Sequence, residues 1–243
     1  MAKVLFAAMS LRRIKGMGVL LLVLGGGAWL ALNVLYPWIE PAAFKYDLLG
    51  VDVSHHQGAV DWDRLKSAGV AFAYIKASEG ENFNDPRFSR NWYTAEQAGM
   101  RRGAYHFFTL CRTGKVQAEN FIRVVPKDPK ALPPVVDAEH MGPCKDTAQI
   151  KDVVAELRVF LDLVGAQYGK RPIIYTTREF HDAFLTVAFP KERFWIRSLM
   201  VEPSFRQSQW LFWQYHNRGR RSGVEGPVDL NAYRGTQGEL DKL

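Results

Sequence analysis

Cysteine is scarce in this chain, which has only Cys111 and Cys144 among its 243 residues. Each cysteine follows a predicted strand by a few residues, so the two could pair in an oxidising compartment and would stay reduced in the cytosol. Two unpaired thiols are the alternative, and the sequence leaves both open. A disulfide between them would fit an exported domain.

Metal-binding patterns are also missing. No His-x-His and no His-Glu-x-x-His occurs, and the tandem pair His55-His56 is by itself a weak ligand signal. His140 would project away from Asp137 and Glu139 if the three residues lie on one strand. We therefore expect no metal and no cofactor.

A nucleic-acid groove is equally unsupported, because no run of Lys or Arg alternates with aromatic residues. The formal net charge is +7, and the first 39 residues contribute Lys3, Arg12, Arg13 and Lys15 but no acid. The surplus in the rest of the chain is too mild to argue for nucleic acid as a partner. It would favour anionic polymers in general.

One long apolar run occurs, from Met17 to Tyr36, and it is interrupted only by glycine and Asn33. About 20 helical residues span the hydrocarbon core of a bilayer. Basic residues precede the run, which predicts a cytoplasmic N-terminus and an extracytoplasmic remainder. We expect a cytoplasmic segment at 1–16, a transmembrane anchor at 17–38, a linker at 39–46 and a folded domain at 47–243.

The expected location is the inner membrane, with a single pass and the domain in the periplasm or otherwise outside the cytoplasm. The alternative is a cleaved signal sequence, after which the domain would be secreted. A signal sequence has a shorter apolar region and a small-x-small cleavage site. The only weak candidate for that site is Pro41-Ala42-Ala43, so the sequence favours the anchor.

Strands and helices alternate through most of the domain, and after Pro190 three strands follow with no room for helices between them. The predicted strands lie at 48–54, 70–77, 102–109, 133–139, 171–176, 194–197, 209–215 and 227–230. Such alternation predicts a parallel α/β sheet or barrel, and eight strands close a small barrel. The expected fold class is α/β, an irregular TIM-like barrel of about five βα units followed by three strands, with an N-terminal transmembrane helix.

The motif Asp137-Ala138-Glu139 ends one of these strands, after the apolar run 132–136. Residues i and i+2 of a strand project to the same face, so the two carboxylates would share a pocket and each would disfavour ionisation of the other. A protonated acid beside a carboxylate suits acid–base catalysis. A lone Asp-x-Glu is common by chance, but the other predicted strands also end in polar or aromatic residues.

The chemistry of a parallel barrel lies where its strands end. Four carboxylates stand at these strand ends, with tyrosine and tryptophan among the other residues there. Aromatic faces stack on pyranose rings, and carboxylates bind hydroxyls or transfer protons. Glycoside hydrolysis usually needs two carboxylates. The strand ends therefore predict a carbohydrate site, and its acidic residues are Asp52, Asp137, Glu139 and Asp229.

Seven motifs follow one another from about residue 47 to 235. They are GVDVSHHQG at 50–58, DW at 61–62, YIKASEG at 74–80, GAYHF at 103–107, VDAE at 136–139, WQY at 213–215 and VDLN at 228–231. In order and spacing they resemble the CH-type lysozymes, family 25 of the glycoside hydrolases. The resemblance implies a barrel of five βα units and three further strands, the same count that the alternation of elements predicts.

The resemblance implies an N-acetylmuramidase that hydrolyses the β-1,4 bond between N-acetylmuramic acid and N-acetylglucosamine in peptidoglycan strands. It implies Glu139 as the general acid. Asp137 would orient the 2-acetamido group of the substrate, which itself attacks the anomeric carbon. Asp52 and Asp229 match two further acidic positions at the floor of the family's site. The expected substrate contacts are Tyr105, Tyr175, Trp195, Arg197, Trp213 and Gln214.

Arg197 departs from the family pattern, which usually has a small residue here. An arginine near the cleft could bind the lactyl carboxylate or a peptide-stem carboxylate through paired hydrogen bonds, or it could block a subsite. The alternative function is a non-catalytic, membrane-tethered glycan-binding domain, since a fold alone does not secure activity. Against this alternative, Asp137 and Glu139 are both present.

Overall fold

The computed structural model describes residues 20–142, 144 and 152–243. Contacts divide the chain into two compact units between Ile39 and Glu40. In the first unit, the helix over Leu20–Trp38 has a mean hydropathy of 1.7 and is 6% buried, so by length and composition it can cross a membrane. A signal sequence near the N-terminus meets the same criterion, and the helix is compatible with both.

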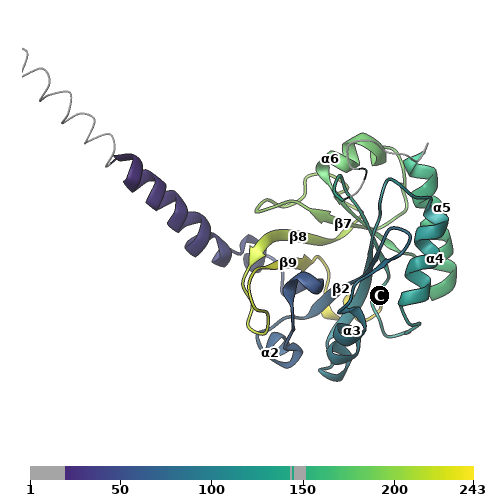
Figure 1. The fold of residues 1–243 in the computed structure, drawn as a ribbon, viewed down its shortest axis with the longest axis horizontal. Coiled ribbons are helices and arrows are strands. Elements are labelled where there is room, and N and C mark those ends of the chain that lie inside the picture. The colour runs from purple at the N-terminus through teal and green to yellow at the C-terminus, as the bar shows by residue number, and fades with distance from the viewer. Residues whose placement is uncertain (1–19, 143, 145–151) are drawn as a thin grey trace, which may run out of the picture. The chain divides into compact units, whose positions relative to one another are not determined.

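The second unit is built on one closed sheet (Figure 1). In the described part of the chain its strands are β1 (Leu48–Val53), β2 (Phe72–Glu79), β3 (Phe83–Asn84), β4 (Arg101–Phe107), β5 (Val135–Ala138), β6 (Ile173–Thr177), β7 (Phe194–Arg197), β8 (Trp210–Gly219) and β9 (Val228–Tyr233). β1 pairs with both β2 and β9, which closes a barrel of eight strands, and β3 forms a short hairpin with β2. β9 is antiparallel to both its neighbours, whereas the other barrel strands run parallel.

Helices lie outside the barrel, as Figure 1 shows for α3, α4 and α5. The described α-helices of this unit are α2 (Trp62–Ser67), α3 (Phe88–Gln97), α4 (Gly114–Val124), α5 (Val153–Tyr168), α6 (Arg178–Phe180), which continues as a π-helix over His181–Leu185, and α7 (Gln237–Leu240). Loops without a helix join β7 to β8 and β8 to β9 in the described chain. The predicted barrel of five strand–helix units followed by three strands is therefore confirmed.

Local sequence signals set the ends of these helices. The Asp61 carboxylate accepts a hydrogen bond from the backbone N–H of Arg64 at 3.0 Å, and Asp152 does the same for Ala155 at 2.9 Å. Both satisfy donors that the first turn of a helix leaves free. Gly169 ends α5 with a φ of 69°, in the left-handed region that glycine adopts at least cost.

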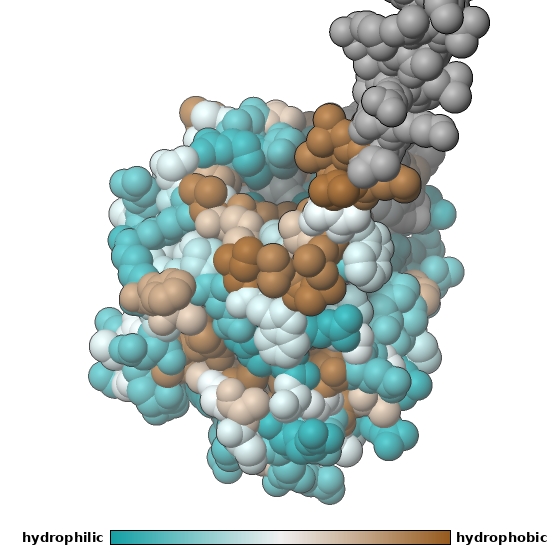
Figure 2. Space-filling view, turned by 90° about the vertical axis from the view of Figure 1, so that its left-hand side faces the viewer, coloured by the Kyte–Doolittle hydropathy of each residue, from teal (hydrophilic) through white to brown (hydrophobic). Residues whose placement is uncertain are grey.

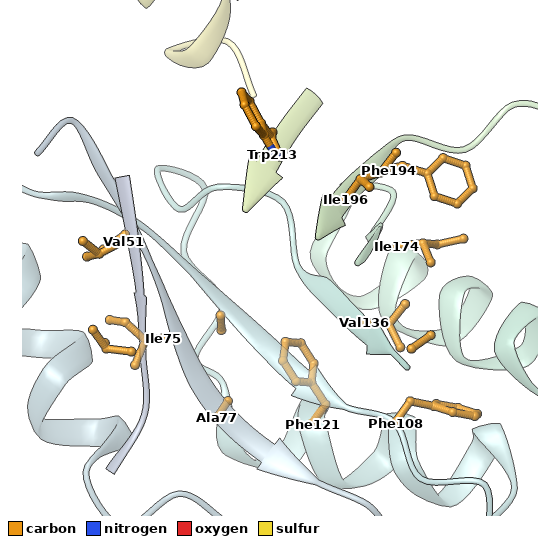
Figure 3. Close-up of a cluster of buried hydrophobic side chains, with 14 of the residues drawn as sticks. Val51, Ile75, Ala77, Phe108, Phe121, Val136, Ile174, Phe194, Ile196 and Trp213 are labelled. Atoms are coloured by element: carbon orange, nitrogen blue, oxygen red, sulfur yellow. The ribbon is translucent and has the colours of Figure 1, made fainter. Parts of the chain in front are cut away.

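Alternate residues along the strands face two different cores. Residues that point outward pack against the helices, as Figure 3 shows for Val51, Ile75, Val136 and Ile174. Residues of the opposite parity fill the barrel interior and form a second apolar cluster. This inner cluster includes Phe72, Tyr74, Val135, Ile173, Trp195 and Phe212. The period of two in the strands therefore determines which side chains can reach the mouth of the barrel.

Two glycines make room for the large rings of β2 inside the barrel. A Cβ atom on Gly50 of β1 would lie 2.4 Å from the ring of Phe72. A Cβ atom on Gly103 of β4 would lie 2.3 Å from the ring of Tyr74. Because β1 and β4 flank β2 on its two sides, the interior accepts both rings only where its neighbours carry no side chain.

Residues 40–46, which the sequence predicts as a linker, pack against the barrel. The Arg221 guanidinium donates to both Glu40 carboxylate oxygens at 2.5 and 2.6 Å. Ala42 is buried, and the Tyr46 hydroxyl donates to Glu202 at 2.8 Å. On the face in Figure 2 the barrel surface is a mixture of hydrophilic residues and several hydrophobic patches.

Candidate active site

A cleft of about 320 Å³ opens at the end of the barrel where the parallel strands finish. This is the end at which parallel barrels carry their chemistry. The residues that line it are Asp52, Val53, Ser54, His56, Gln57, Lys76, Tyr105, Phe107, Asp137, Glu139, Met141, Tyr175, Trp195, Arg197, Gln214, Asn217 and Asp229. Most are polar or aromatic, which suits a hydroxyl-rich ligand with apolar ring faces.

Asp137 and Glu139 enter this cleft from the end of β5, on the same face as Val135. Asp137 Oδ1 and Glu139 Oε2 are buried and have no hydrogen-bond partner among the described residues. Burial, followed by the charge of Glu139, raises the pKa of Asp137 well above its ordinary value. Burial also raises the pKa of Glu139 to about 7, against the opposing charge of Arg197. At neutral pH the pair therefore retains a proton.

Asp52 and Asp229 face each other across the antiparallel pairing of β1 and β9. Burial raises the pKa of both carboxyl groups, and for Asp229 the charge of Asp52 adds to this. A hydrogen bond joins the two side chains, which favours the charged form of Asp52 and the protonated form of Asp229. The two carboxyl groups at the floor of the cleft therefore favour sharing a proton over ionising together.

Two buried amides hold the Asp52 carboxylate in place. Asp52 Oδ2 accepts hydrogen bonds from Gln214 Nε2 at 2.9 Å and from Asn231 Nδ2 at 2.8 Å. Gln214 Oε1 accepts from the Tyr175 hydroxyl, and Asn231 Oδ1 accepts from Trp195 Nε1, each at 2.9 Å. Because each amide oxygen is occupied by a donor, each NH₂ group must point at the carboxylate.

The direction of β9 explains how Asp229 reaches this floor. The sequence predicts Asp229 near the end of a strand in a parallel barrel. In the structure Asp229 is the second residue of β9, and β9 runs opposite to its neighbours. The start of an antiparallel strand lies beside the ends of the parallel ones, so Asp229 joins the same cleft.

Residues 51–224 match the model of the family described as Glycosyl hydrolases family 25. The chain belongs to this family. Lysozyme M1 of Streptomyces globisporus is 36% identical over 205 residues, which are 79% of this chain and 69% of the relative. YegX of Escherichia coli K12 is 36% identical over 202 residues, 81% of this chain and 73% of that protein.

The fold comparison agrees with the sequence comparison. A family 25 glycosyl hydrolase from Bacillus anthracis superposes with a TM-score of 0.76 at 42% identity, and the match covers 82% of this chain and 94% of the other. This protein is therefore a glycoside hydrolase of a lysozyme family, as the motifs predict. Its substrate class is peptidoglycan.

The structure brings nine of the ten predicted site residues of this family 25 hydrolase to the cleft and leaves Trp213 out. Trp213 is buried in the outer core, where Figure 3 draws it. Its Nε1 donates to the Ser198 carbonyl at 2.7 Å, and its ring contacts Tyr46 and Tyr215. Adjacent residues of a strand face opposite sides, so Trp213 and Gln214 cannot both point into the barrel.

Two further residues in or beneath the cleft of the hydrolase were not among the predicted site residues. Asn231, which orients Asp52, follows Asp229 at a spacing of two on β9, and that spacing is the signal that could have found it. Lys76 also lines the cleft, because it lies two residues after Tyr74 on β2 and points to the same interior face as Phe72 and Tyr74. Its Nζ forms an ion pair with Glu79 Oε2 at 2.7 Å.

A disulfide joins Cys111 to Cys144 in the structure, with Cα atoms 5.7 Å apart. It links the chain after β4 to the chain after β5, close in sequence to Asp137 and Glu139. Within the described residues, no group of three or more His, Cys, Asp or Glu side chains is placed to hold a metal ion. The chemistry open to this cleft is proton transfer and electrostatic stabilisation by carboxyl groups.

Proposed function

We propose that this family 25 hydrolase is an N-acetylmuramidase that hydrolyses the β-1,4 bond between N-acetylmuramic acid and N-acetylglucosamine. The observation that carries the proposal is the buried pair of Asp137 and Glu139, which holds a proton at neutral pH. Relatives named lysozyme and N,O-diacetylmuramidase support the bond assignment.

Glu139 would act as the general acid and give its proton to the glycosidic oxygen as the bond from that oxygen to the anomeric carbon breaks. The carbonyl oxygen of the neighbouring 2-acetamido group would attack the same carbon and form a cyclic oxazolinium intermediate. Water would then open this intermediate, with the Glu139 carboxylate taking its proton. Substrate assistance of this kind needs no enzyme nucleophile.

Asp137 would accept a hydrogen bond from the acetamido N–H. A donated hydrogen bond favours the anionic form of a carboxyl group. Substrate binding would therefore place the negative charge on Asp137 and leave the shared proton on Glu139. This division supplies an acid and an orienting anion from two groups on one strand.

Asp52 and Asp229 would stabilise the positive charge that develops at the anomeric carbon, since the hydrogen bonds to Asp52 favour its charged form. Tyr105, Tyr175 and Trp195 are proposed sugar contacts, and all three line the cleft. The polar ends of Tyr175 and Trp195 already bind the two amides, so a sugar would contact the small part of each ring that lines the cleft.

The helix over Leu20–Trp38 would anchor the enzyme in the inner membrane, with the barrel on the extracytoplasmic side. Four basic residues before the helix and the absence of acid there support this orientation. Intact mass of the protein recovered from membranes would test the anchor. A mass that lacks the first 38 or so residues would show a cleaved signal sequence instead.

Digestion of purified peptidoglycan with the full chain tests the bond assignment. Fragments would be reduced with borohydride and identified by mass spectrometry. We expect new reducing N-acetylmuramic acid ends, and a loss of about 10²- to 10⁴-fold in rate for Glu139→Gln. Glu119→Gln, an exposed glutamate on α4, is the matched control and should cleave normally. New reducing N-acetylglucosamine ends would overturn the bond assignment.

A further inference from the structure

The cleft contains two cations, Lys76 and Arg197, and only one of them is committed to a partner. Lys76 Nζ lies 2.7 Å from Glu79 Oε2 and over the ring of Phe107. Arg197 has a single ionic contact among the described residues, from Nη1 to Glu139 Oε2 at 4.0 Å. That separation is beyond hydrogen-bonding range. The guanidinium makes no hydrogen bond with any described residue, so its five N–H donors are open.

The position of Arg197 points these donors at the substrate. Arg197 is the last residue of β7 and shares a face with Trp195, which also lines the cleft. Its side chain is 31% exposed. A guanidinium presents a planar fork that matches a carboxylate through two parallel hydrogen bonds. An anion bound there would lie beside Glu139, close to the bond that is broken.

We propose that Arg197 is a specificity-determining residue that binds a carboxylate of the glycan strand, which neutralises its charge beside Glu139. The proposal rests on the proposed function of the cleft. The carboxylate has two possible sources of the same chemistry. One is the lactyl group of muramic acid, which is free where no peptide is attached. The other is a carboxylate of the stem peptide, where the lactyl group is consumed in an amide bond.

Binding of this carboxylate links substrate recognition to the state of the acid. In the free enzyme burial raises the pKa of Glu139, and the charge of Arg197 makes this rise smaller than it would otherwise be. A substrate carboxylate neutralises that charge, so Glu139 holds its proton more firmly in the complex. The other charged groups that act on Glu139 include Asp52 from β1, Lys76 from β2, Asp137 on its own strand, Glu179 on α6 and Asp229 from β9.

The first experiment measures binding without turnover. The full chain carrying Glu139→Gln, in detergent micelles, would be titrated with three kinds of glycan strand. These are peptide-bearing strands, strands stripped of peptide, and stripped strands whose carboxylates are converted to primary amides. Addition of Arg197→Met should weaken binding by about 10- to 100-fold on a carboxylate-bearing strand and leave the amidated strand unaffected.

Two further variants make the result specific. Arg197→Lys keeps the charge but loses the fork, so it should recover only part of the affinity. Arg90→Met removes the same charge from the exposed face of α3 and should bind all strands like the parent. A loss confined to stripped strands assigns the lactyl carboxylate, and a loss confined to peptide-bearing strands assigns the stem. Equal binding of the Arg197→Met chain and its parent on all strands would overturn the proposal.

Turnover separates this proposal from the proposed function. With Glu139 restored, Arg197→Met should lower kcat/KM on carboxylate-bearing strands and, at acidic pH where Glu139 is protonated, leave it unchanged on amidated strands. On amidated strands its alkaline limb should move to higher pH, because a cation beside Glu139 is gone. Carboxylate-dependent binding without any cleavage by the unmutated chain would refute the muramidase function and leave the role of Arg197 standing.

Discussion

At the scale of single residues, the active site is governed by burial of carboxyl groups. Asp52, Asp137, Glu139 and Asp229 all have a raised pKa, and burial is the largest cause for each. The charges of Lys76 and Arg197 lower these pKa values but do not cancel the effect of burial. Four buried acids therefore hold fewer negative charges than four exposed ones would, which keeps the cleft compatible with proton donation to a sugar.

The raised pKa of Glu139 predicts the pH dependence of the reaction. Because the general acid must be protonated, kcat/KM should be retained at acidic pH and should fall as pH rises through about 7. The measurement is initial cleavage rate on soluble glycan strands between pH 4 and 9, with circular dichroism at each pH to exclude unfolding. A rate that stays constant to pH 9 would contradict Glu139 as the acid.

The raised pKa of Asp229 predicts that Asp229→Asn, whose amide cannot lose a proton, will be more stable than the parent at neutral pH. Above about pH 4 the folded protein holds a proton on Asp229 that the unfolded chain has released, so this group's stabilisation is lost as pH rises. Asp229→Asn does not titrate, and its amide can donate to Asp52 at every pH. Its Tm should exceed that of the parent by a few degrees at pH 7.5.

Comparison across pH makes the Asp229→Asn result specific. The difference in Tm should close toward pH 4, where the unfolded chain is protonated as well. Asp241→Asn, at an exposed position, is the control and should show no such trend. A Tm difference that is constant from pH 4 to 7.5 would mean that packing, and not the proton, is responsible.

At the scale of elements, the positions of the strands could be predicted from the sequence, but the direction of β9 could not. The eight barrel strands were predictable because their apolar runs are short and bounded by turns, and the parity of Asp137 and Glu139 follows from the strand repeat alone. The direction of β9 could not be predicted, since the sequence of one strand does not show whether its neighbours run parallel or antiparallel to it. Trp213 was expected in the cleft because the whole Trp-Gln-Tyr motif was assigned to the site. The alternation of side chains along a strand places Trp213 in the outer core instead.

Packing inside the barrel gives a prediction for β1 and β4. Gly103→Ala would place a methyl group 2.3 Å from the buried ring of Tyr74, and Gly50→Ala would do the same at 2.4 Å from Phe72. Each should lower the free energy of unfolding by about 1–3 kcal/mol, measured by urea denaturation. Gly165→Ala on α5 is the matched control, because the atom nearest to the added Cβ, Pro172 Cδ, is at an ordinary contact distance of 3.5 Å.

The control should change stability in the opposite direction. Alanine replaces glycine within a helix at Gly165, which raises stability by about 0.5–1 kcal/mol. If Gly50→Ala and Gly103→Ala are as stable as the parent, the rings of β2 can shift. The packing of the barrel interior would then tolerate an added methyl group, although the contact distances indicate that it should not.

At the scale of the whole molecule, the segment between the apolar helix and the barrel belongs structurally to the barrel. Arg221 is 12% exposed and binds both oxygens of Glu40, and Tyr46 lies against Trp210 and Trp213. Composition favours a linker at 39–46, since prolines and short polar stretches are typical of linkers. Sequence alone could not show these contacts, because Glu40 and Arg221 are 181 residues apart.

Truncation tests whether this segment stabilises the enzyme. A chain that begins at Glu40 should unfold at a higher urea concentration than one that begins at Asp47. The longer chain keeps the Glu40–Arg221 pair and the buried Tyr46, and loss of one partner from a largely buried ion pair costs about 3 kcal/mol. Phe44→Ser in the longer chain is the control, because Phe44 is 94% exposed and should not affect stability. Equal urea midpoints for the two chains would show that residues 40–46 serve only as a tether, and a lower midpoint for Glu40→Gln would identify the ion pair as the stabilising contact.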